Sequence, residues 1–208
     1  MSKKLKYWGW GYEETPLPPN FVANRAATLK AMFNIKSFEN VQPLPLNELQ
    51  LRTPRFELPL AFQTYCTADK YERARHTYGQ AFRDIWRAVH GQFDNPPDYI
   101  AFPKTEEQIL DLMQFAAKNT IALVPFGGGS SVCGGIESTH DAHYNGVIII
   151  NLKHFNKILA VDKASRSANI QAGIFGPALN AGLKPHNLVL RHYPQSFEFS
   201  TLGGWIVT

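Results

Sequence analysis

The sequence predicts a mixed α/β fold, and three observations lead to this prediction. The chain of 208 residues is 44% hydrophobic and 18% charged, so it can bury a sizeable core as one or two domains. Beyond residue 97, short apolar runs alternate with segments of helical periodicity. The 15 Gly and 14 Pro are spread along the chain without a fixed repeat, which excludes collagen-like and solenoid architectures.

Residues 1–95 are predicted to form an N-terminal extension with two helices. The first, at about residues 24–33, interrupts a proline-rich stretch that is otherwise expected to be extended. The second is expected to begin with a capping box at Asp69 and to end at Gly91, because apolar residues recur at steps of three or four. The interior Gly79 costs about 1 kcal/mol relative to Ala in a helix, which indicates a close approach of another segment or a ligand.

Residues 96–208 are predicted to form a second domain that begins with a βαβ unit. Its helix is expected to be capped by Thr105 and to end near Asn119. Pro177 is well placed in the first turn of a further short helix, and the apolar residues 202–207 are expected to be an unpaired edge strand. Strands are predicted at residues 99–102, 121–126, 147–152, 158–162 and 167–172, the last two as a hairpin.

Charge and hydropathy exclude several classes of protein. The net charge of +4 is mild and dispersed, so no nucleic acid partner is predicted. The longest apolar run, at residues 147–150, is too short to span a bilayer, and the lysines at the start are not followed by an apolar signal segment, so a cytoplasmic location is expected. Cys66 and Cys133 are far apart and outside any CxxC pattern, which predicts two reduced thiols.

The most informative motif is PFGGGSSVCGG at residues 125–135, directly after a predicted strand. Three consecutive glycines permit positive φ and allow backbone N–H groups to converge on a pyrophosphate, while Ser130 and Ser131 add hydroxyl donors. No Lys follows the glycines, which excludes a Walker loop, and Val132 stands where a GxGxxG motif needs its third Gly. The alternative is a flexible Gly/Ser surface loop.

A second cluster, QSFEFSTLGGWIVT, occupies residues 195–208. It combines aromatic walls with small hydroxyl donors, a combination suited to a flat ring system. Taken alone, the cluster is better interpreted as a buried strand that ends in a turn.

In this order and spacing, the two clusters resemble the PCMH-type FAD-binding domain of the vanillyl alcohol oxidase family. Two further segments resemble one branch of that family, the alkylglycerone phosphate synthases. They read KYWGWGY at residues 6–12 and HTYGQAFRDIWRAVHGQFDNPPDYIAFP at residues 76–103.

The resemblance implies that FAD binds along both clusters. A side chain at Gly128 would occupy the space of the diphosphate oxygens. Gly129 stands where covalent members of the family carry a His, so the FAD is expected to be noncovalent, and Gln195 replaces an Asp that usually begins the second run. The implied cofactor-binding residues are Pro125, Phe126, Gly127, Gly128, Gly129, Ser130, Ser131, Gln195, Ser196, Phe197, Glu198, Phe199, Ser200, Thr201 and Thr208.

The resemblance also implies an activity, the exchange of an acyl for an alkyl group on acyl-dihydroxyacetone phosphate in ether lipid synthesis. The alternatives are an FAD-dependent oxidase or dehydrogenase of a 2-hydroxy acid such as lactate or glycolate, and a flavin-binding fragment without activity. The chain is expected to be an N-terminal fragment, with the catalytic residues beyond Thr208. Expected partners are a small-molecule lipid or 2-hydroxy acid substrate, a second copy in a homodimer, and a membrane surface in peripheral contact.

A possible metal cluster at His140, Asp141 and His143 lies in a polar loop without a fourth ligand. A solvated loop is therefore the favoured interpretation, and no metal is predicted.

Arg83, Arg87 and His90 would be suited to a phosphate or carboxylate site, but a solvated helix face is the favoured interpretation. His192 precedes the second cluster and is interpreted as structural.

Overall fold

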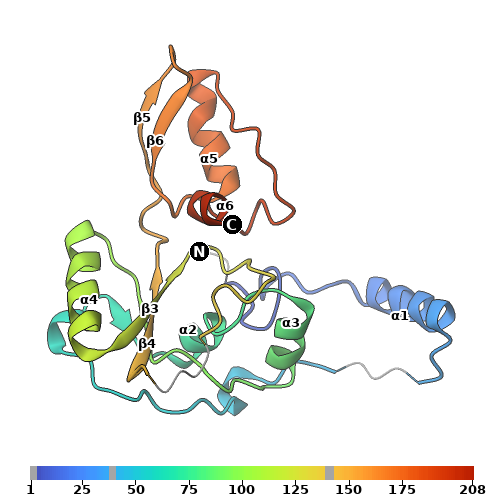
Figure 1. Ribbon diagram of the computed structural model, residues 1–208. Coiled ribbons are helices and arrows are strands. Elements are labelled where there is room, and N and C mark those ends of the chain that lie inside the picture. Colours follow the sequence, from blue (N-terminus) through green and yellow to red (C-terminus); the bar gives the residue numbers. More distant parts are fainter. Residues whose placement is uncertain (1–3, 38–40, 139–142) are drawn as a thin grey trace.

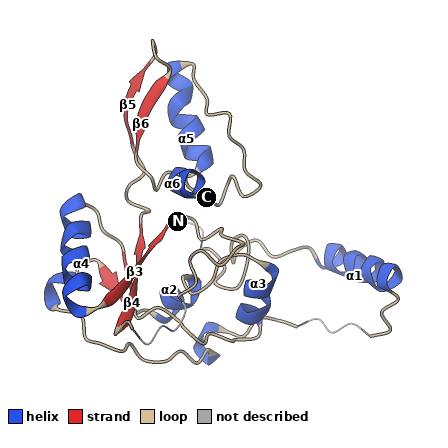
Figure 2. Cartoon of the chain, in the orientation of Figure 1, coloured by secondary structure: helices blue, strands red, loops and turns tan. Residues whose placement is uncertain are grey.

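The computed structural model describes residues 4–37, 41–138 and 143–208, and it confirms the mixed α/β class. One part of the molecule holds a four-stranded sheet, and a smaller part above it holds a two-stranded sheet, two helices and the C-terminus (Figures 1 and 2). Helix α1 (Pro19–Phe33) projects away from both parts and buries none of its residues. The predicted helix at residues 24–33 is thus present and begins five residues earlier.

The larger sheet has the strand order β1-β2-β4-β3. Strands β2 (Tyr99–Ala101) and β3 (Ile121–Phe126) both run parallel to β4 (Gly146–Asn151), whereas β1 (Cys66–Thr67) is antiparallel to β2. All six residues of β4 are buried, as expected for a central parallel strand that is covered on both faces. The strands predicted at these positions after residue 96 are confirmed, and β4 lies between the two strands of the predicted βαβ unit.

Helix α4 (Glu106–Asn119) covers one face of this sheet (Figure 1). The Thr105 hydroxyl accepts a hydrogen bond from the Gln108 N–H at 3.4 Å, which confirms the predicted cap. Leu112 and Ala116 are buried against the sheet in the same apolar cluster as Ile148. This packing buries one face of the parallel strands.

The smaller part begins with the predicted hairpin, β5 (Ile158–Asp162) and β6 (Ser167–Ile170), in antiparallel pairing. Helix α5 (Gly176–Leu183) carries Pro177 in its first turn, as predicted, and continues into a 3₁₀ turn at Lys184–His186. Leu179 and Leu183 pack with Ile174 into a core of their own.

The edge strand predicted at residues 202–207 is wrong, because this segment forms helix α6 (Leu202–Val207). Leu202 and Trp205 both pack on the core of the smaller part, whereas Ile206 and Val207 are exposed. Contacts three residues apart suit a helix and not the two-residue alternation of a strand.

The single helix predicted to run from Asp69 to Gly91 is also wrong, since the chain forms α2 (Lys70–Arg75) and α3 (Phe82–Val89) with a break between them. The Asp69 carboxylate accepts a hydrogen bond from the Glu72 N–H at 3.0 Å, as its capping role requires. The described residues of the extension therefore form three α-helices, with 3₁₀ turns at Leu46–Glu48 and Leu60–Phe62.

A contact with the glycine-rich loop explains this break. The Gln80 N–H donates to the Ser131 carbonyl at 2.7 Å, and a Cβ on Gly79 would overlap the same carbonyl oxygen. The close approach predicted at Gly79 is thus made by another segment of the chain. The domain boundary between residues 95 and 96 stays a prediction. Strand β1, which precedes this boundary, pairs with β2, which follows it.

Asp98 ties the extension to the larger sheet. Its fully buried carboxylate accepts hydrogen bonds from Arg52 Nη1 at 2.5 Å and Arg55 Nη2 at 2.8 Å, and from the Val147 N–H at 2.7 Å. Burial alone would raise the pKa of Asp98, but the hydrogen bonds from Arg55 and Arg52 outweigh it and lower the pKa.

Both cysteines are free, as predicted. Within the described ranges, no helix has both the length and the apolar character needed to cross a bilayer.

Candidate functional site

The three glycines predicted to bind phosphate follow β3 directly, at its carboxyl end. Gly129 has a φ of 72°, in the left-handed region, whereas Gly127 and Gly128 have negative φ. The positive φ that the glycine run permits is thus adopted at Gly129 and not at Gly128, where the lack of a side chain has another cause.

That cause is the second sequence cluster, which packs against the first. A Cβ on Gly128 would overlap the carbonyl oxygen of Phe199, and a Cβ on Gly127 would overlap the hydroxyl of Thr201. The space beside Gly128, predicted to hold diphosphate oxygens, is filled by the Phe199 backbone. The structure nevertheless brings the two predicted clusters together.

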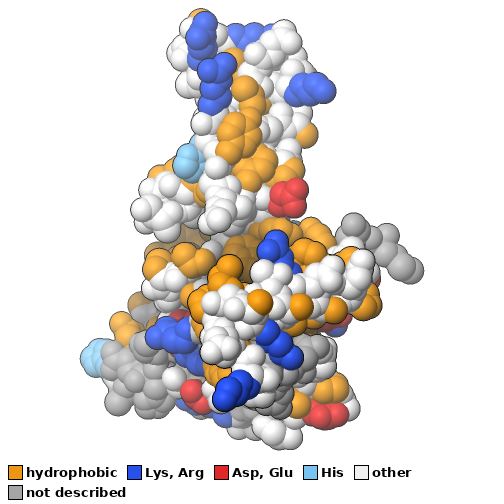
Figure 3. Space-filling view, turned by 90° about the vertical axis from the view of Figure 1, so that its right-hand side faces the viewer, with side chains coloured by type: hydrophobic (Ala, Val, Ile, Leu, Met, Phe, Trp, Pro, Cys, Tyr) orange, Lys and Arg blue, Asp and Glu red, His pale blue; other side chains and the backbone are white. Residues whose placement is uncertain are grey.

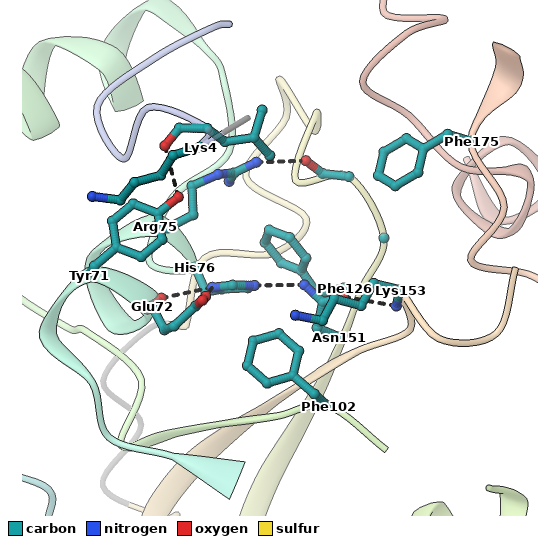
Figure 4. A pocket seen from close by; sticks show the side chains of 13 residues that line it. Lys4, Tyr71, Glu72, Arg75, His76, Phe102, Phe126, Asn151, Lys153 and Phe175 are labelled. Carbon is teal, nitrogen blue, oxygen red and sulfur yellow. Dashed lines mark hydrogen bonds and ion pairs between the residues drawn. The ribbon is translucent and has the colours of Figure 1, made fainter. Parts of the chain in front are cut away.

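A cavity of about 510 Å³ opens beside the triglycine loop (Figure 4). Its walls come from α2, from the carboxyl ends of the parallel strands, from the loop and from the N-terminal segment. Ligands of open parallel sheets commonly bind at this end of the strands. The lining residues are Lys4, Leu5, Tyr71, Glu72, Arg75, His76, Phe102, Phe126, Gly127, Gly128, Asn151, Lys153 and Phe175.

His76 is held rigidly in the cavity wall. Its Nε2 lies 2.8 Å from Asn151 Nδ2, which must donate, so Nδ1–H donates to the Glu72 carbonyl at 2.7 Å (Figure 4). The Phe126 ring packs on the imidazole with centroids 4.2 Å apart. Burial, together with the nearby Arg75 charge, lowers the pKa of His76 to about 3, so its imidazole is neutral at physiological pH.

Positive charge predominates around the cavity. Lys4 lines it, and Lys153 Nζ lies 3.7 Å above the centroid of the Phe102 ring. Among the described residues of the wall, Glu72 is the one carboxylate, and burial raises its pKa. This balance favours an anionic ligand.

The backbone of the loop fits a diphosphate. Among the described residues, no acceptor pairs with the N–H groups of Gly127, Gly128 or Gly129, and Gly129 is buried. Arg75 Nε and Nη1 are likewise buried without a hydrogen-bond partner. Buried donors without acceptors are uncommon in folded proteins, and an anion would satisfy those of the loop.

The second cluster is rigid, but it does not line this cavity. Ser200 accepts a hydrogen bond from Trp205 Nε1 at 2.7 Å and donates to the Ser196 carbonyl at 2.9 Å. Phe197 stacks on Trp205 with ring planes 15° apart, and Phe199 packs on the N-terminal aromatic segment.

Of the predicted cofactor-binding residues, Phe126, Gly127 and Gly128 form part of the cavity wall. For the other predicted residues, cofactor binding stays a prediction, with FAD expected along the contact between the two clusters. The face seen in Figure 3 is indented between the two parts of the molecule, and hydrophobic side chains border the indentation.

The sequence patterns did not predict Lys4, Arg75, His76 and Lys153 as cavity residues. Arg75 and His76 lie at the end of α2, directly before the break that the sequence pattern did not predict. No pattern in the sequence predicts that Lys4 and Lys153 lie at this cavity.

The solvated face predicted for Arg83 and Arg87 is wrong for Arg87. Its guanidinium bonds Glu137 at 2.6 Å and Asp84 at 2.9 Å, and its side chain is only 17% exposed. Arg83, at 70% exposure, also reaches Glu137, at 3.2 Å. These ion pairs attach α3 to the end of the glycine-rich loop.

The remaining candidates have structural contacts. His90 packs on Trp86 with centroids 3.9 Å apart, and His192 lies 5.3 Å from the Trp205 ring. His140 and Asp141 lie outside the described residues. Within the described ranges, no group of three His, Cys, Asp or Glu side chains is placed to hold a metal ion.

The sequence model of the FAD binding domain matches residues 97–208, more than half of the chain. The chain belongs to the FAD-binding domain family. FAD, the cofactor predicted from the two glycine-containing clusters, is thereby confirmed as the cofactor of the family.

Individual relatives refine this assignment. The chain is 41% identical over 140 residues to the alkyldihydroxyacetonephosphate synthase of Dictyostelium discoideum, which covers 67% of this chain and 23% of the relative. The synthase of Trypanosoma brucei brucei is 36% identical over 138 residues, covering 66% and 22%. The chain therefore spans less than a quarter of the length of these relatives.

A solved structure of alkyldihydroxyacetonephosphate synthase superimposes with a TM-score of 0.81 at 29% identity. The match covers 98% of this chain and 43% of that structure. It therefore includes the extension as well as the FAD-binding domain.

Proposed function

We propose that the full-length protein is an FAD-dependent enzyme that exchanges the acyl group of acyl-dihydroxyacetone phosphate for a fatty alcohol, in ether lipid synthesis. The extent of the similarity carries this proposal. The alignments to alkyldihydroxyacetonephosphate synthases, at 138 and 140 residues, are longer than the matched FAD-binding domain, so they include residues that precede it. The structural match extends over nearly the whole chain.

In this proposal the residues of the chain bind and orient the cofactor. The N–H groups of Gly127, Gly128 and Gly129 bind the diphosphate, and the hydroxyls of Ser130 and Ser131 add donors. The residues of the second cluster, 195–201 together with Thr208, line the path of the adenine and the ring system. FAD, when bound without a covalent link, supplies the reactive isoalloxazine ring.

Oxidation of a 2-hydroxy acid is the second candidate, and other relatives favour it. The glycolate oxidase subunit GlcD of Bacillus subtilis is 26% identical over 113 residues, and the D-2-hydroxyglutarate dehydrogenase of Haemophilus influenzae is 33% identical over 116. These alignments are about as long as the FAD-binding domain alone, which many reactions share.

Two assays on the purified full-length protein separate the candidates. We expect a labelled long-chain alcohol to be incorporated into the product when acyl-dihydroxyacetone phosphate is present, with release of the fatty acid. We expect no reduction of an artificial electron acceptor by D-lactate, glycolate or D-2-hydroxyglutarate. Oxidation of one of these acids without alcohol incorporation would replace the first proposal by the second.

The homodimer, the peripheral membrane contact and the cytoplasmic location stay predictions. Sedimentation velocity of the same preparation, with and without lipid vesicles, tests the first two.

A further inference from the structure

Arg75, the last residue of α2, is a buried cation that lacks a carboxylate partner. It is 8% exposed, and its guanidinium makes one hydrogen bond, from Nη2 to the Gly128 carbonyl at 3.0 Å. No carboxylate of the described residues forms an ion pair with it. Burial lowers its pKa, and the charge of Glu72, which lies in the same cavity wall, offsets this only in part. A buried charge without an opposite charge is costly, so an anion close by would stabilise this arrangement.

The hydrogen bond from Arg75 also sets the direction of the next peptide group. Across a trans peptide bond, the carbonyl of one residue and the N–H of the following residue point in opposite directions. No cis peptide bond occurs in the described residues, so the N–H of Gly129 points away from Arg75. This N–H is one of the loop donors that have no acceptor among the described residues.

Close packing keeps the guanidinium against the loop. A Cβ on Gly129 would lie 2.8 Å from Arg75 Nη1, and the Phe126 ring lies 5.6 Å from the guanidinium carbon. Figure 4 shows Arg75 reaching the loop from the side of α2, across the cavity from Phe175. Arg75 thus lies on one side of the loop, with the unpaired Gly129 N–H directed to the other.

We propose that Arg75 is a positioning residue for the diphosphate of the cofactor. It fixes the Gly128 carbonyl so that the Gly129 N–H faces the phosphates, and its charge stabilises them through the loop backbone. The inference rests on the proposed function, since it takes the FAD diphosphate as the ligand of the triglycine loop. It gives the extension, which precedes the matched FAD-binding domain, a direct part in cofactor binding.

Equilibrium binding of FAD to the full-length apoprotein tests this role. Arg75→Gln is expected to weaken FAD binding about 10- to 100-fold, because a charge-assisted hydrogen bond and a charge are both lost. Arg75→Lys keeps the charge but not the planar donor geometry, so a loss of only about 3- to 10-fold is expected. The control is Arg25→Gln, since Arg25 is exposed on α1, a helix that projects away from the loop and buries none of its residues.

Displacement of FAD by ADP and by adenosine separates a role at the diphosphate from a general structural role. Arg75→Gln should weaken the binding of ADP about as much as the binding of FAD, and it should leave the affinity for adenosine unchanged. Equal weakening of ADP and adenosine binding, or an FAD affinity equal to that of the Arg25→Gln control, would overturn the inference. If the Gln variant does not fold, the same comparison with Arg75→Lys decides.

These outcomes are independent of the reaction. A parent protein that binds FAD but incorporates no alcohol would refute the proposed function and leave the role of Arg75 intact. A parent protein that binds no FAD would overturn both.

Discussion

Gly128→Ala tests whether the two glycine-containing clusters meet as the structure has them. The new Cβ would overlap the Phe199 carbonyl oxygen, and it would lie 2.7 Å from the carbonyl carbon and 3.1 Å from Phe175 Cε1. Two of these atoms belong to the backbone, so no side-chain rotation can relieve the overlap. Overpacking typically costs about 1 to 3 kcal/mol, and the upper end applies where backbone must move.

For a folding unit of this size, about 3 kcal/mol corresponds to a fall in Tm of roughly 6 to 12 °C. The flavin content of the purified protein should fall as well, because the loop and the second cluster must separate. Thermal unfolding followed by circular dichroism, together with flavin absorbance, measures both effects. The substitution thus affects stability and cofactor retention together, whereas a clash with the diphosphate alone would spare the apoprotein.

Gly204→Ala is the matched control. A Cβ there would lie 3.8 Å from the Thr201 hydroxyl, an ordinary van der Waals distance, and Gly204 has negative φ within α6. Alanine is favoured over glycine inside a helix by about 0.5 to 1 kcal/mol, so this variant should melt no lower than the parent protein. If Gly128→Ala melts with the parent and keeps its flavin, the contact between Gly128 and Phe199 does not exist in solution.

The remaining predictions concern pH, a buried ion pair and the flavin linkage. Because the folded-state pKa of His76 is about 3 and the unfolded-state value is about 6.5, unfolding takes up a proton between these limits. The contribution of His76 to the free energy of unfolding is therefore fully present above pH 6.5. It decreases by up to ~1.4 kcal/mol per pH unit as the pH falls toward 4. In urea unfolding, His76→Gln should reduce this dependence of the unfolding free energy on pH. An equal pH dependence in the parent protein and the variant would contradict the burial of His76. Asp98→Asn should destabilise by about 3 to 5 kcal/mol because it leaves two arginines without their carboxylate, whereas exposed Asp162→Asn should have little effect in the same unfolding experiment. Acid precipitation should release the flavin into the supernatant, since Gly129 offers no side chain for a covalent link; yellow colour in the pellet would refute this.

The sequence predicted the elements that depend on local patterns. The Thr105 cap, the apolar run of β4 and the β5–β6 hairpin were predicted because each is decided by residues that are neighbours in the chain. The break between α2 and α3 could not be predicted, because the helical spacing of apolar residues continues from Tyr78 to Phe82. It depends on the contact with Ser131, which lies far along the chain.

The candidate site, like the fold, could be predicted only where it depends on residues that are neighbours in the chain. The glycine-rich loop has a local signature and was found, whereas Arg75 and Lys153 reach the cavity from distant segments. The sequence explained the glycine at position 128 by the space that the diphosphate needs. The contact with Phe199 could not be predicted, since only the folded chain places Phe199 beside Gly128. Residues 202–207 show a different limit, because a short apolar run fits a strand or a helix equally well.

A loop that binds phosphate through glycine N–H groups lacks side chains with which to hold its own shape. Glycine also loses more conformational freedom on ordering than any other residue, which weakens binding unless the loop is ordered beforehand. In this chain the order comes from the segment before the FAD-binding domain: Arg75 bonds the Gly128 carbonyl, the Gln80 N–H bonds the Ser131 carbonyl, and Arg87 bonds Glu137. The interruption between α2 and α3 is what allows Gln80 to reach the loop, since a continuous helix would use that N–H internally. The residues that precede the FAD-binding domain therefore hold the triglycine loop in the shape that the proposed contact with the diphosphate requires.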